Sequence, residues 1–242
     1  MVISRFFFEV IEMSHETQQP PRKPIRSFVK REGRVTVRQQ KAIESLWDKH
    51  VVQPATLANL QTLFPNTNPT VLEIGFGMGD SLLAMAKAQP DVNFVGVEVH
   101  RPGVGSVLAG IDDYSLGNLK VCSHDAFELF DCHLTDASID KILILFPDPW
   151  HKKKHHKRRL INADFINMLY KKLKARGRIH VATDWAHYAE EIREAFEKSR
   201  LFELVEEVHN LPKENPHRIE TKFERRGKRL GHAVVDLFYV KL

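Results

Sequence analysis

Short apolar runs alternate with segments of helical periodicity through most of the chain from residue 71 onward. Each run has the length of a strand, and the stretch that follows it has apolar residues three and four positions apart. Regular alternation of this kind predicts an α/β fold with a doubly wound, mostly parallel sheet. The predicted parallel strands are 71–74, 93–99, 119–123, 141–146 and 178–183.

The last two predicted strands, 202–208 and 232–240, are joined by a long polar loop instead of a helix. Strands that follow one another without a crossover helix pair in antiparallel fashion. We therefore expect a seven-stranded sheet with an antiparallel strand at its C-terminal edge. Two of the expected helices precede it, one over about 162–174 that is ended by Gly177 and one near 185–198.

The N-terminal part of the chain has a different pattern. Residues 1–21 are polar and end in two prolines, which predicts a disordered leader, and Met13 would serve equally well as the natural start. A basic arm follows, and the spacing of Thr36 and Gln39 predicts a helix that begins with a capping box. The stretch 52–70 is expected to be a connector. Residues 22–242 are predicted to form a single domain, with the arm and helix over 22–52.

Composition narrows the classes of function. The chain has 242 residues, two cysteines and a net charge of +5. Two cysteines cannot build a disulfide framework, and the apolar run in the leader is too short for a signal peptide or a membrane span. We therefore expect a cytoplasmic protein with no membrane partner. Positive charge gathers at 22–41, 152–159 and 222–229, which favours an anionic polymer as partner over ordinary solvated loops.

Three alternating glycines, Gly75, Gly77 and Gly79, follow the first predicted strand and precede a helical pattern. Such a turn lets the backbone approach a ligand closely, and the helix points free N–H groups at the same place. The third glycine comes one position too early for the dinucleotide fingerprint, and Glu73 would repel a pyrophosphate. Glu73 suits a ligand with an ammonium group, such as S-adenosylmethionine. The pattern resembles motif I of the class I methyltransferases and disfavours a nicotinamide-dependent oxidoreductase.

Acidic residues stand at the ends of the first four predicted strands, where doubly wound sheets bind their ligands. They are Glu73, Glu98, Asp125 and Asp148. Glu98 has the position expected of a ribose-binding carboxylate, and Asp125 suits the adenine end of the cofactor. A single acid at a strand end is commonly solvated or caps a helix, but a set at successive ends indicates a site.

Two prolines flank Asp148 in the segment 146–150, which reads Phe-Pro-Asp-Pro-Trp. They stiffen the turn and so hold Asp148 where the transferable methyl group is expected, with Trp150 beside it. Methyltransferases that act on ring or exocyclic nitrogens have a comparable Asp/Asn-Pro-aromatic turn. A rigid turn with a core tryptophan is the alternative.

Six lysines and arginines and three histidines make up the segment 151–159. His151 and His155 are four residues apart and could share a helical face, as metal ligands do. The surrounding cations would repel a divalent ion, so we expect no metal here and favour contact with phosphates.

Six segments of the sequence occur in the order 73–79, 96–105, 146–152, 157–160, 182–185 and 221–227. Together they resemble the bacterial tRNA (guanine-N7-)-methyltransferase family, and the resemblance extends from about residue 25 to the C-terminus. It implies a Rossmann-like class I methyltransferase fold, S-adenosylmethionine as cofactor, and tRNA as substrate, methylated at N7 of a guanosine in the variable loop. We expect a monomer.

The resemblance also implies roles for individual residues, with Asp148 catalytic. S-adenosylmethionine would be bound by Glu73, Gly75, Gly77, Glu98, Asp125 and Asp148. Substrate would be bound by Lys152, Asp184, Thr221, Lys222, Phe223 and Glu224. RNA would be contacted by Lys154, His155, His156, Lys157, Arg158 and Arg159. The alternatives are a methyltransferase for another RNA or for protein, and a non-catalytic RNA-binding protein on the same fold, against which the intact acids argue.

Overall fold

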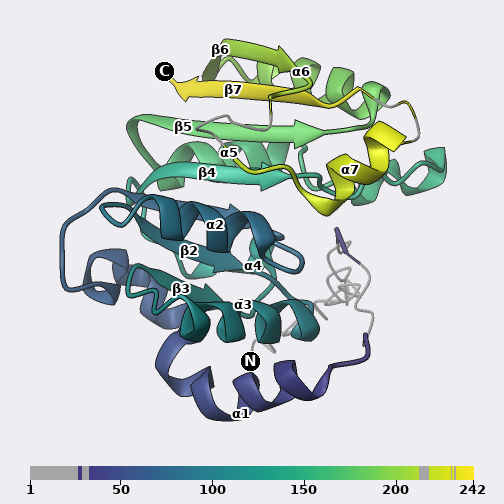
Figure 1. Cartoon of the computed structure of the whole chain (residues 1–242). Helices are drawn as coiled ribbons and strands as arrows, with labels where there is room; N and C mark the ends of the chain where they lie inside the picture. The colour runs from purple at the N-terminus through teal and green to yellow at the C-terminus, as the bar shows by residue number, and fades with distance from the viewer. Residues whose placement is uncertain (1–26, 29–32, 213–217, 230, 232) are drawn as a thin grey trace, which may run out of the picture.

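The computed structural model describes residues 27–28, 33–212, 218–229, 231 and 233–242 (Figure 1). The predicted leader, 1–21, and most of the basic arm lie outside these residues. Within the described residues, no helix is both long enough and apolar enough to cross a membrane.

Seven strands form one sheet in the order β3-β2-β1-β4-β5-β7-β6. They are β1 (Thr70–Ile74), β2 (Asn93–Val97), β3 (Leu119–Cys122), β4 (Ile139–Leu145), β5 (Leu173–Thr183), β6 (Phe202–His209) and β7 (Val235–Lys241). β1 to β5 pair in parallel, whereas β7 runs antiparallel to both of its neighbours. The predicted fold class is confirmed, and the antiparallel strand lies between β5 and the outermost strand, β6.

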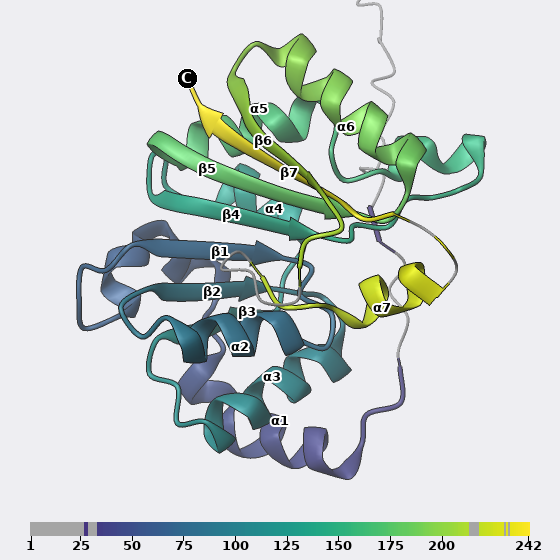
Figure 2. The ribbon, with the colours of Figure 1, turned by 45° about the horizontal axis from the view of Figure 1, so that its top comes forward.

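Helices cover both faces of the sheet, as a parallel sheet requires. They are α1 (Val37–His50), α2 (Asp80–Ala88), α3 (Arg101–Asp113), α4 (Ala126–Cys132), α5 (Ala163–Lys172), α6 (Ala186–Ser199) and α7 (Lys222–Arg229), with 3₁₀ segments η1 (Pro54–Leu63) and η2 (Lys153–Arg158). One apolar core joins α1, α2 and α3 to residues such as Val71 and Phe94, and another joins α4, α5 and α6 to Leu72 and Ile142. Figure 2 shows α1 beneath α3, outside the layer that touches the sheet.

The first helix begins as its sequence predicts. The Thr36 hydroxyl accepts a hydrogen bond from the Gln39 backbone N–H at 3.3 Å, and the Gln39 side chain accepts one from the Thr36 backbone N–H at 2.8 Å. These two bonds form the expected capping box and satisfy N–H groups that have no partner inside the helix. The helix packs against α3, where a Cβ added to Gly105 would lie 2.9 Å from the Gln39 side chain.

Two expectations for the C-terminal half were wrong. Gly177 does not end a helix, because α5 ends at Lys172 and Leu173 already pairs with Ile139 of β4. The fully buried Leu173 side chain joins the core, so strand pairing overrides the helical pattern there. The loop between β6 and β7 is also not only polar loop, because it contains α7.

Candidate active site

The glycine turn after β1 has the backbone that its sequence predicts. Gly75, Gly77 and Gly79 have φ angles of 72°, 60° and 81°, in the left-handed region that other residues rarely adopt. A side chain on Gly79 would also collide with Val107 of α3, because an added Cβ would lie 2.0 Å from a Val107 methyl. The turn therefore needs glycine for its conformation and for its packing, and α2 begins directly after it.

The Glu98 carboxylate, at the end of the neighbouring strand β2, is hydrogen-bonded to this turn. It accepts hydrogen bonds from the backbone N–H groups of Gly77 at 2.9 Å, Val99 at 2.7 Å and His100 at 2.9 Å. These bonds tie the end of β2 to the glycine turn. Carboxylate oxygens can accept four bonds in total, so acceptor capacity is left for a ligand hydroxyl.

Glu73 is buried in β1, with only 2% of its surface exposed. Its Oε2 atom has no hydrogen-bond partner in the described part of the chain. Burial, together with the negative charge of Glu98, raises the pKa of the Glu73 carboxyl to about 8. An oxygen without a donor at this depth is costly, and the ammonium group of S-adenosylmethionine would supply a donor. The residues present therefore fit this cofactor.

Asp125 has a structural task in this conformation. Its carboxylate accepts a hydrogen bond from the Glu128 backbone N–H at 3.2 Å and so caps α4. The neighbours His124 and Ala126 line the cavity beyond the sheet, whereas Asp125 does not. The assignment of Asp125 to the adenine end therefore rests on the sequence.

The turn after β4, residues 146–150, contains the predicted catalytic residue Asp148 and is named the catalytic turn; its backbone is strained. Phe146 and Trp150, which bracket Pro147, Asp148 and Pro149, both have positive φ angles, 54° and 47°. Such angles are uncommon outside glycine and persist only where surrounding contacts impose them.

Three contacts hold this turn. The Phe146 backbone N–H donates to the Ala182 carbonyl at 2.8 Å, and the Pro149 carbonyl accepts from Arg159 Nε at 2.8 Å. Trp150 Nε1 donates to the Ser27 carbonyl at 3.1 Å, which joins the turn to the arm. Hydrogen bonds on both sides of the exposed Asp148 therefore hold its backbone in place.

A cavity of about 700 Å³ lies beyond the carboxyl ends of the parallel strands, and its opening is named the catalytic mouth. It brings together six of the predicted site residues, namely Gly75, Gly77, Glu98, Asp148, Lys152 and His155. This is the size range of small-molecule and cofactor sites, and the position is the usual ligand position of doubly wound sheets. Glu73, Asp125 and Asp184 are not part of its lining.

The basic segment after the catalytic turn divides into exposed and buried cations. Lys153, Lys154 and Lys157 of η2 are exposed to solvent. Partial desolvation and the neighbouring cations, Lys154 foremost, lower the pKa of His155, so its ring is neutral near pH 7. Arg159, which the sequence assigned to RNA, is buried, with only 4% of its surface exposed.

The buried Arg159 side chain is engaged within the protein. Its guanidinium pairs with Glu191 of α6 and lies 4.7 Å from the centre of the Tyr188 ring. Together with its bond to Pro149, these contacts connect α6 to the catalytic turn. Arg159 therefore positions the site and is not available to a phosphate.

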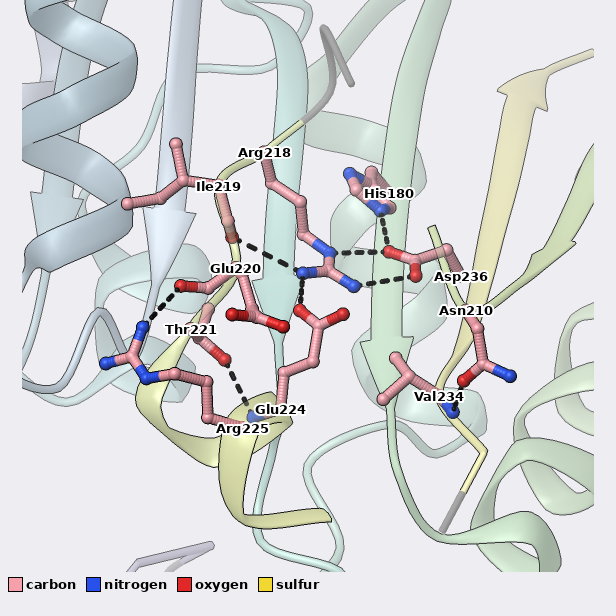
Figure 3. Close-up of polar contacts among 10 residues, drawn as sticks. All are labelled: His180, Asn210, Arg218, Ile219, Glu220, Thr221, Glu224, Arg225, Val234 and Asp236. Carbon is pink, nitrogen blue, oxygen red and sulfur yellow. Dashed lines mark hydrogen bonds and ion pairs between the residues drawn. The ribbon is translucent and has the colours of Figure 1, made fainter. Parts of the chain in front are cut away.

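A chain of buried charges attaches α7 to the sheet (Figure 3). Arg218 donates two hydrogen bonds to the Asp236 carboxylate of β7, at 2.7 and 2.8 Å, and a third to Glu224 of α7. His180 of β5 donates Nε2–H to Asp236 at 2.7 Å, and burial lowers the His180 pKa to about 4, so the ring is neutral. The Arg218 guanidinium also lies 5.2 Å from the centre of the Phe146 ring in the catalytic turn.

This arrangement revises the predicted substrate-binding run over 221–224. Glu224 is 1% exposed and paired with Arg218, so its carboxylate anchors α7 and does not face a substrate. Thr221 accepts a hydrogen bond from the Glu224 backbone N–H at 3.1 Å, as a helix cap does. The side chains of Lys222 and Phe223 lie outside the described part of the structure.

Asp184, which follows β5, lies directly under α7. A Cβ added to Gly227 of α7 would come within 2.9 Å of an Asp184 carboxylate oxygen. Only glycine lets the helix approach this carboxylate so closely. Asp184 and α7, to which residues 222–224 belong, therefore pack against each other.

The described residues contain one group with metal-ligand chemistry. His124, Glu128 and His133 present ligand atoms within 4.8 Å of one another, on and beside α4. The His124 ring already contacts the Glu128 carboxylate at 3.4 Å, as an ordinary surface pair does. His151 and His155, which the sequence suggested as a pair, do not form such a group.

Comparison with known proteins gives this geometry a family. A family model described as "Putative methyltransferase" matches residues 67–237. A tRNA (guanine-N(7)-)-methyltransferase of Colwellia psychrerythraea is 45% identical over 234 residues, which is 96% of either chain. The chain belongs to the tRNA (guanine-N7-)-methyltransferase family. The protein of that name from Neisseria meningitidis serogroup B is 47% identical over 219 residues, 90% of this chain and 91% of that protein.

Solved structures with low sequence identity confirm the fold of the methyltransferase. The 16S rRNA methyltransferase KamB aligns with a TM-score of 0.56 at 14% identity, over 75% of this chain and 91% of that chain. A 16S rRNA (adenine(1408)-N(1))-methyltransferase from Catenulisporales acidiphilia, solved with its cosubstrate SAM, gives 0.54 at 15% identity, over 79% and 92%. The sheet is thus a class I methyltransferase sheet.

Sequence reasoning missed several residues of this methyltransferase site. Ser27 and Phe28 of the arm line the cavity, and a single aromatic residue within a basic stretch was their only signal. His100 and His124 also line it, and both are close in sequence to a predicted acid. Arg218 gave no signal, because one arginine in a polar loop predicts nothing about burial.

Proposed function

We propose that this chain transfers a methyl group from S-adenosylmethionine to N7 of a guanosine in the variable loop of tRNA. Membership of the tRNA (guanine-N7-)-methyltransferase family carries the proposal. The cavity beyond the strand ends supports it, because it joins the glycine turn to Asp148 and Lys152.

The cofactor is held by groups of both neighbouring strands. The glycine turn leaves room for the methionine part, and Glu73 accepts a hydrogen bond from its ammonium group. Glu98 accepts hydrogen bonds from the ribose hydroxyls, in addition to the three that it already accepts from backbone N–H groups. Asp125 remains assigned to the adenine end. When bound, S-adenosylmethionine supplies an electrophilic methyl group on a sulfonium.

The nucleophile needs little activation. Guanine N7 is a lone-pair acceptor on the major-groove edge and carries no proton, so the enzyme needs no general base to create it. The task of the protein is to hold the purine in line and to stabilise the positive charge that develops on it. Asp148 does this through its fixed negative charge or by accepting hydrogen bonds from guanine N1–H and the exocyclic amine.

The tRNA binds around the opening of the cavity. Lys152 and Asp184 contact the substrate nucleotide at the two sides of the mouth, and the exposed lysines of η2 contact phosphates. Phosphate contacts of this kind give affinity and position but carry no sequence information. The enzyme acts in the cytoplasm as a monomer.

Mass spectrometry of digested RNA tests the proposal. Purified enzyme and labelled S-adenosylmethionine are incubated with unmodified tRNA, with ribosomal RNA and with total protein, and the products are hydrolysed and analysed. We expect label in 7-methylguanosine of the tRNA variable loop and none in the other two pools. Label in another nucleoside, in ribosomal RNA or in protein would contradict the proposed substrate, and no label in any pool would contradict catalysis.

A further inference from the structure

A second cavity, of about 540 Å³, lies at the end of the sheet opposite the catalytic mouth. Strand pairing places Phe94, Val71, Lys141 and Arg178 side by side across β2, β1, β4 and β5, and all four line this cavity. Lys141 precedes Leu145, the last residue of β4, by four residues, or roughly 13 Å along the strand. The catalytic turn lies beyond Leu145, so the two cavities are separate.

The lining of this second cavity divides into an apolar and a basic part. Met85, Val92, Phe94 and Leu143 supply apolar surface from α2 and the sheet. The charged lining consists of Lys141, Lys174, Arg176 and Arg178 against the single acid Asp140. The cavity therefore carries a surplus of three positive charges.

Asp140 balances only one of these cations. Its Oδ2 atom accepts hydrogen bonds from Lys174 Nζ and from the Thr70 backbone N–H, both at 2.8 Å. The side chains of Lys141, Arg176 and Arg178 have no hydrogen bond or ion pair with any described residue. Burial and the nearby Arg178 charge lower the pKa of the Lys141 ammonium.

The basic wall comes from an irregular segment of β5. Residues 174–177 bulge out opposite Asp140 alone, because Leu173 pairs with Ile139 and Arg178 already pairs with Lys141. Arg176 has a positive φ of 61°, and a side chain on Gly177 would come within 2.9 Å of the Lys174 carbonyl oxygen. A strained conformation that gathers unpaired cations around a cavity is a feature of binding sites.

We propose that this cavity binds a nucleoside diphosphate or triphosphate. Phosphate oxygens would pair with Lys141, Arg176 and Arg178 in charge-assisted hydrogen bonds, and the base would lie against the apolar part near Phe94 and Met85. The volume suits a ligand of this size. An RNA backbone is the less suitable occupant, because its sugar-phosphate chain would leave the apolar part near Phe94 and Met85 uncovered.

Isothermal titration calorimetry with guanosine diphosphate tests this site. The titration is made at about 0.15 M salt, which screens unspecific attraction between exposed charges. Saturating S-adenosylhomocysteine, the demethylated cofactor, keeps the nucleotide out of the catalytic cavity. We expect one guanosine diphosphate per chain, and much weaker binding of guanosine, which lacks the phosphates.

Two single variants and one control locate the binding. Arg176→Gln and Arg178→Gln replace exposed side chains, so the fold should survive, and each should weaken binding by about 10- to 100-fold. Lys171→Gln removes an exposed lysine of α5 that does not line the cavity, and it should bind as the wild type does. Equal S-adenosylhomocysteine affinity in all four proteins shows that the catalytic end is intact.

Three results would overturn the proposal. The first is no binding of guanosine diphosphate at millimolar concentration. The second is binding that both arginine variants leave unchanged, which would place the nucleotide elsewhere. The third is a loss of tRNA affinity in the arginine variants without any nucleotide binding, which would make this cavity a contact for the RNA backbone.

Discussion

Arg218 and Glu73 are both ionisable residues buried in the sheet region, and their surroundings differ in one respect. Arg218 donates to two carboxylates, Asp236 and Glu224, so its charge is compensated within the protein. The Oε2 atom of Glu73 has no donor among the described residues, and the pKa of its carboxyl is raised to about 8. Burial of a charge is costly in both cases, but only for Arg218 does the fold itself supply the partners.

The presence or absence of partners within the protein distinguishes a structural residue from a ligand-binding one. A compensated buried charge holds elements together, here α7 against β7 and the catalytic turn. A buried carboxyl without donors keeps its proton up to a raised pKa, which lowers the stability of the free protein near neutral pH, and a cationic ligand favours its ionised form. Removing each charge should therefore have opposite effects on stability.

Loss of the Arg218 charge should have the largest effect. Arg218→Met leaves Asp236 and Glu224 buried without their partner, and breaking a buried ion pair in this way costs about 3–5 kcal/mol. We expect the free energy of unfolding, measured with urea, to fall by this amount. Arg225→Met is the matched control, because Arg225 is exposed and, among the described residues, its side chain bonds to the Glu220 carbonyl; it should change stability by less than about 0.5 kcal/mol. Equal stability of the two variants would remove the anchoring role.

Asp148 extends the comparison, because the residue is exposed in the cavity and is proposed to act on the reacting purine. Asp148→Asn keeps the size and both prolines but removes the negative charge. Loss of one preorganised electrostatic group typically costs about 100- to 1,000-fold in rate, so we expect this loss in single-turnover methyl transfer. Saturating tRNA and S-adenosylmethionine ensure that weaker binding does not imitate slower chemistry. A rate within about threefold of the wild type would leave Asp148 as a turn residue only.

Glu73→Gln should stabilise the cofactor-free protein, in contrast to Arg218→Met. In the wild type the folded pKa is about 8 and the ordinary value is 4.5, so the folded state binds the proton more tightly. Stability is therefore lost as the pH rises from 4.5 toward 8, by a quantity on the order of 3 kcal/mol near neutral pH. The glutamine variant lacks this loss, so the two unfolding free energies should agree near pH 4 and diverge up to pH 8.

The same variant should bind S-adenosylmethionine less tightly. An amide cannot pair with the ammonium group as a carboxylate does, and calorimetry should show a loss of about 1–3 kcal/mol. Glu206→Gln, at an exposed position of β6, controls for the loss of one negative charge. Parallel pH curves of the Glu73 variant and the wild type, or unchanged cofactor affinity, would show that Glu73 is not a ligand-binding carboxylate.

Much of the fold could be predicted from the sequence, because period and capping are local properties. The alternating strands and helices, the capping box at Thr36 and the glycine turn all follow from residues close together in the chain. The misplaced end of α5 shows the limit. Leu173 fits a helix and a strand equally well by pattern, and only its pairing with Ile139 in the folded sheet decides between them.

The site was predictable to the same extent. Glycines, strand-end acids and the Pro-Asp-Pro turn have local signatures, and the cavity brings most of them together. Charged residues such as Arg159 and Glu224 were assigned to ligands because their burial depends on distant partners, Glu191 and Arg218, that no local pattern reveals. Charge in a sequence thus does not by itself separate a side chain that binds a ligand from one that is paired within the protein.

Replacement of the exposed lysines of η2 should have the smallest effect, and it should change tRNA binding without changing stability. Replacing Lys153, Lys154 and Lys157 by Ala should leave unfolding and cofactor affinity unchanged, since these side chains are solvated. The slope of log affinity for tRNA against log salt should become shallower by up to about 0.7–0.9 for each phosphate that the variant no longer neutralises.

Arg159 is kept intact because its substitution would disturb the catalytic turn. Replacement of Lys87, Lys171 and Lys198, three exposed lysines on other helices, removes the same charge as a control. If both triple variants change the slope equally, net charge alone attracts the tRNA; if only the η2 variant does, the segment next to Asp148 holds the phosphates.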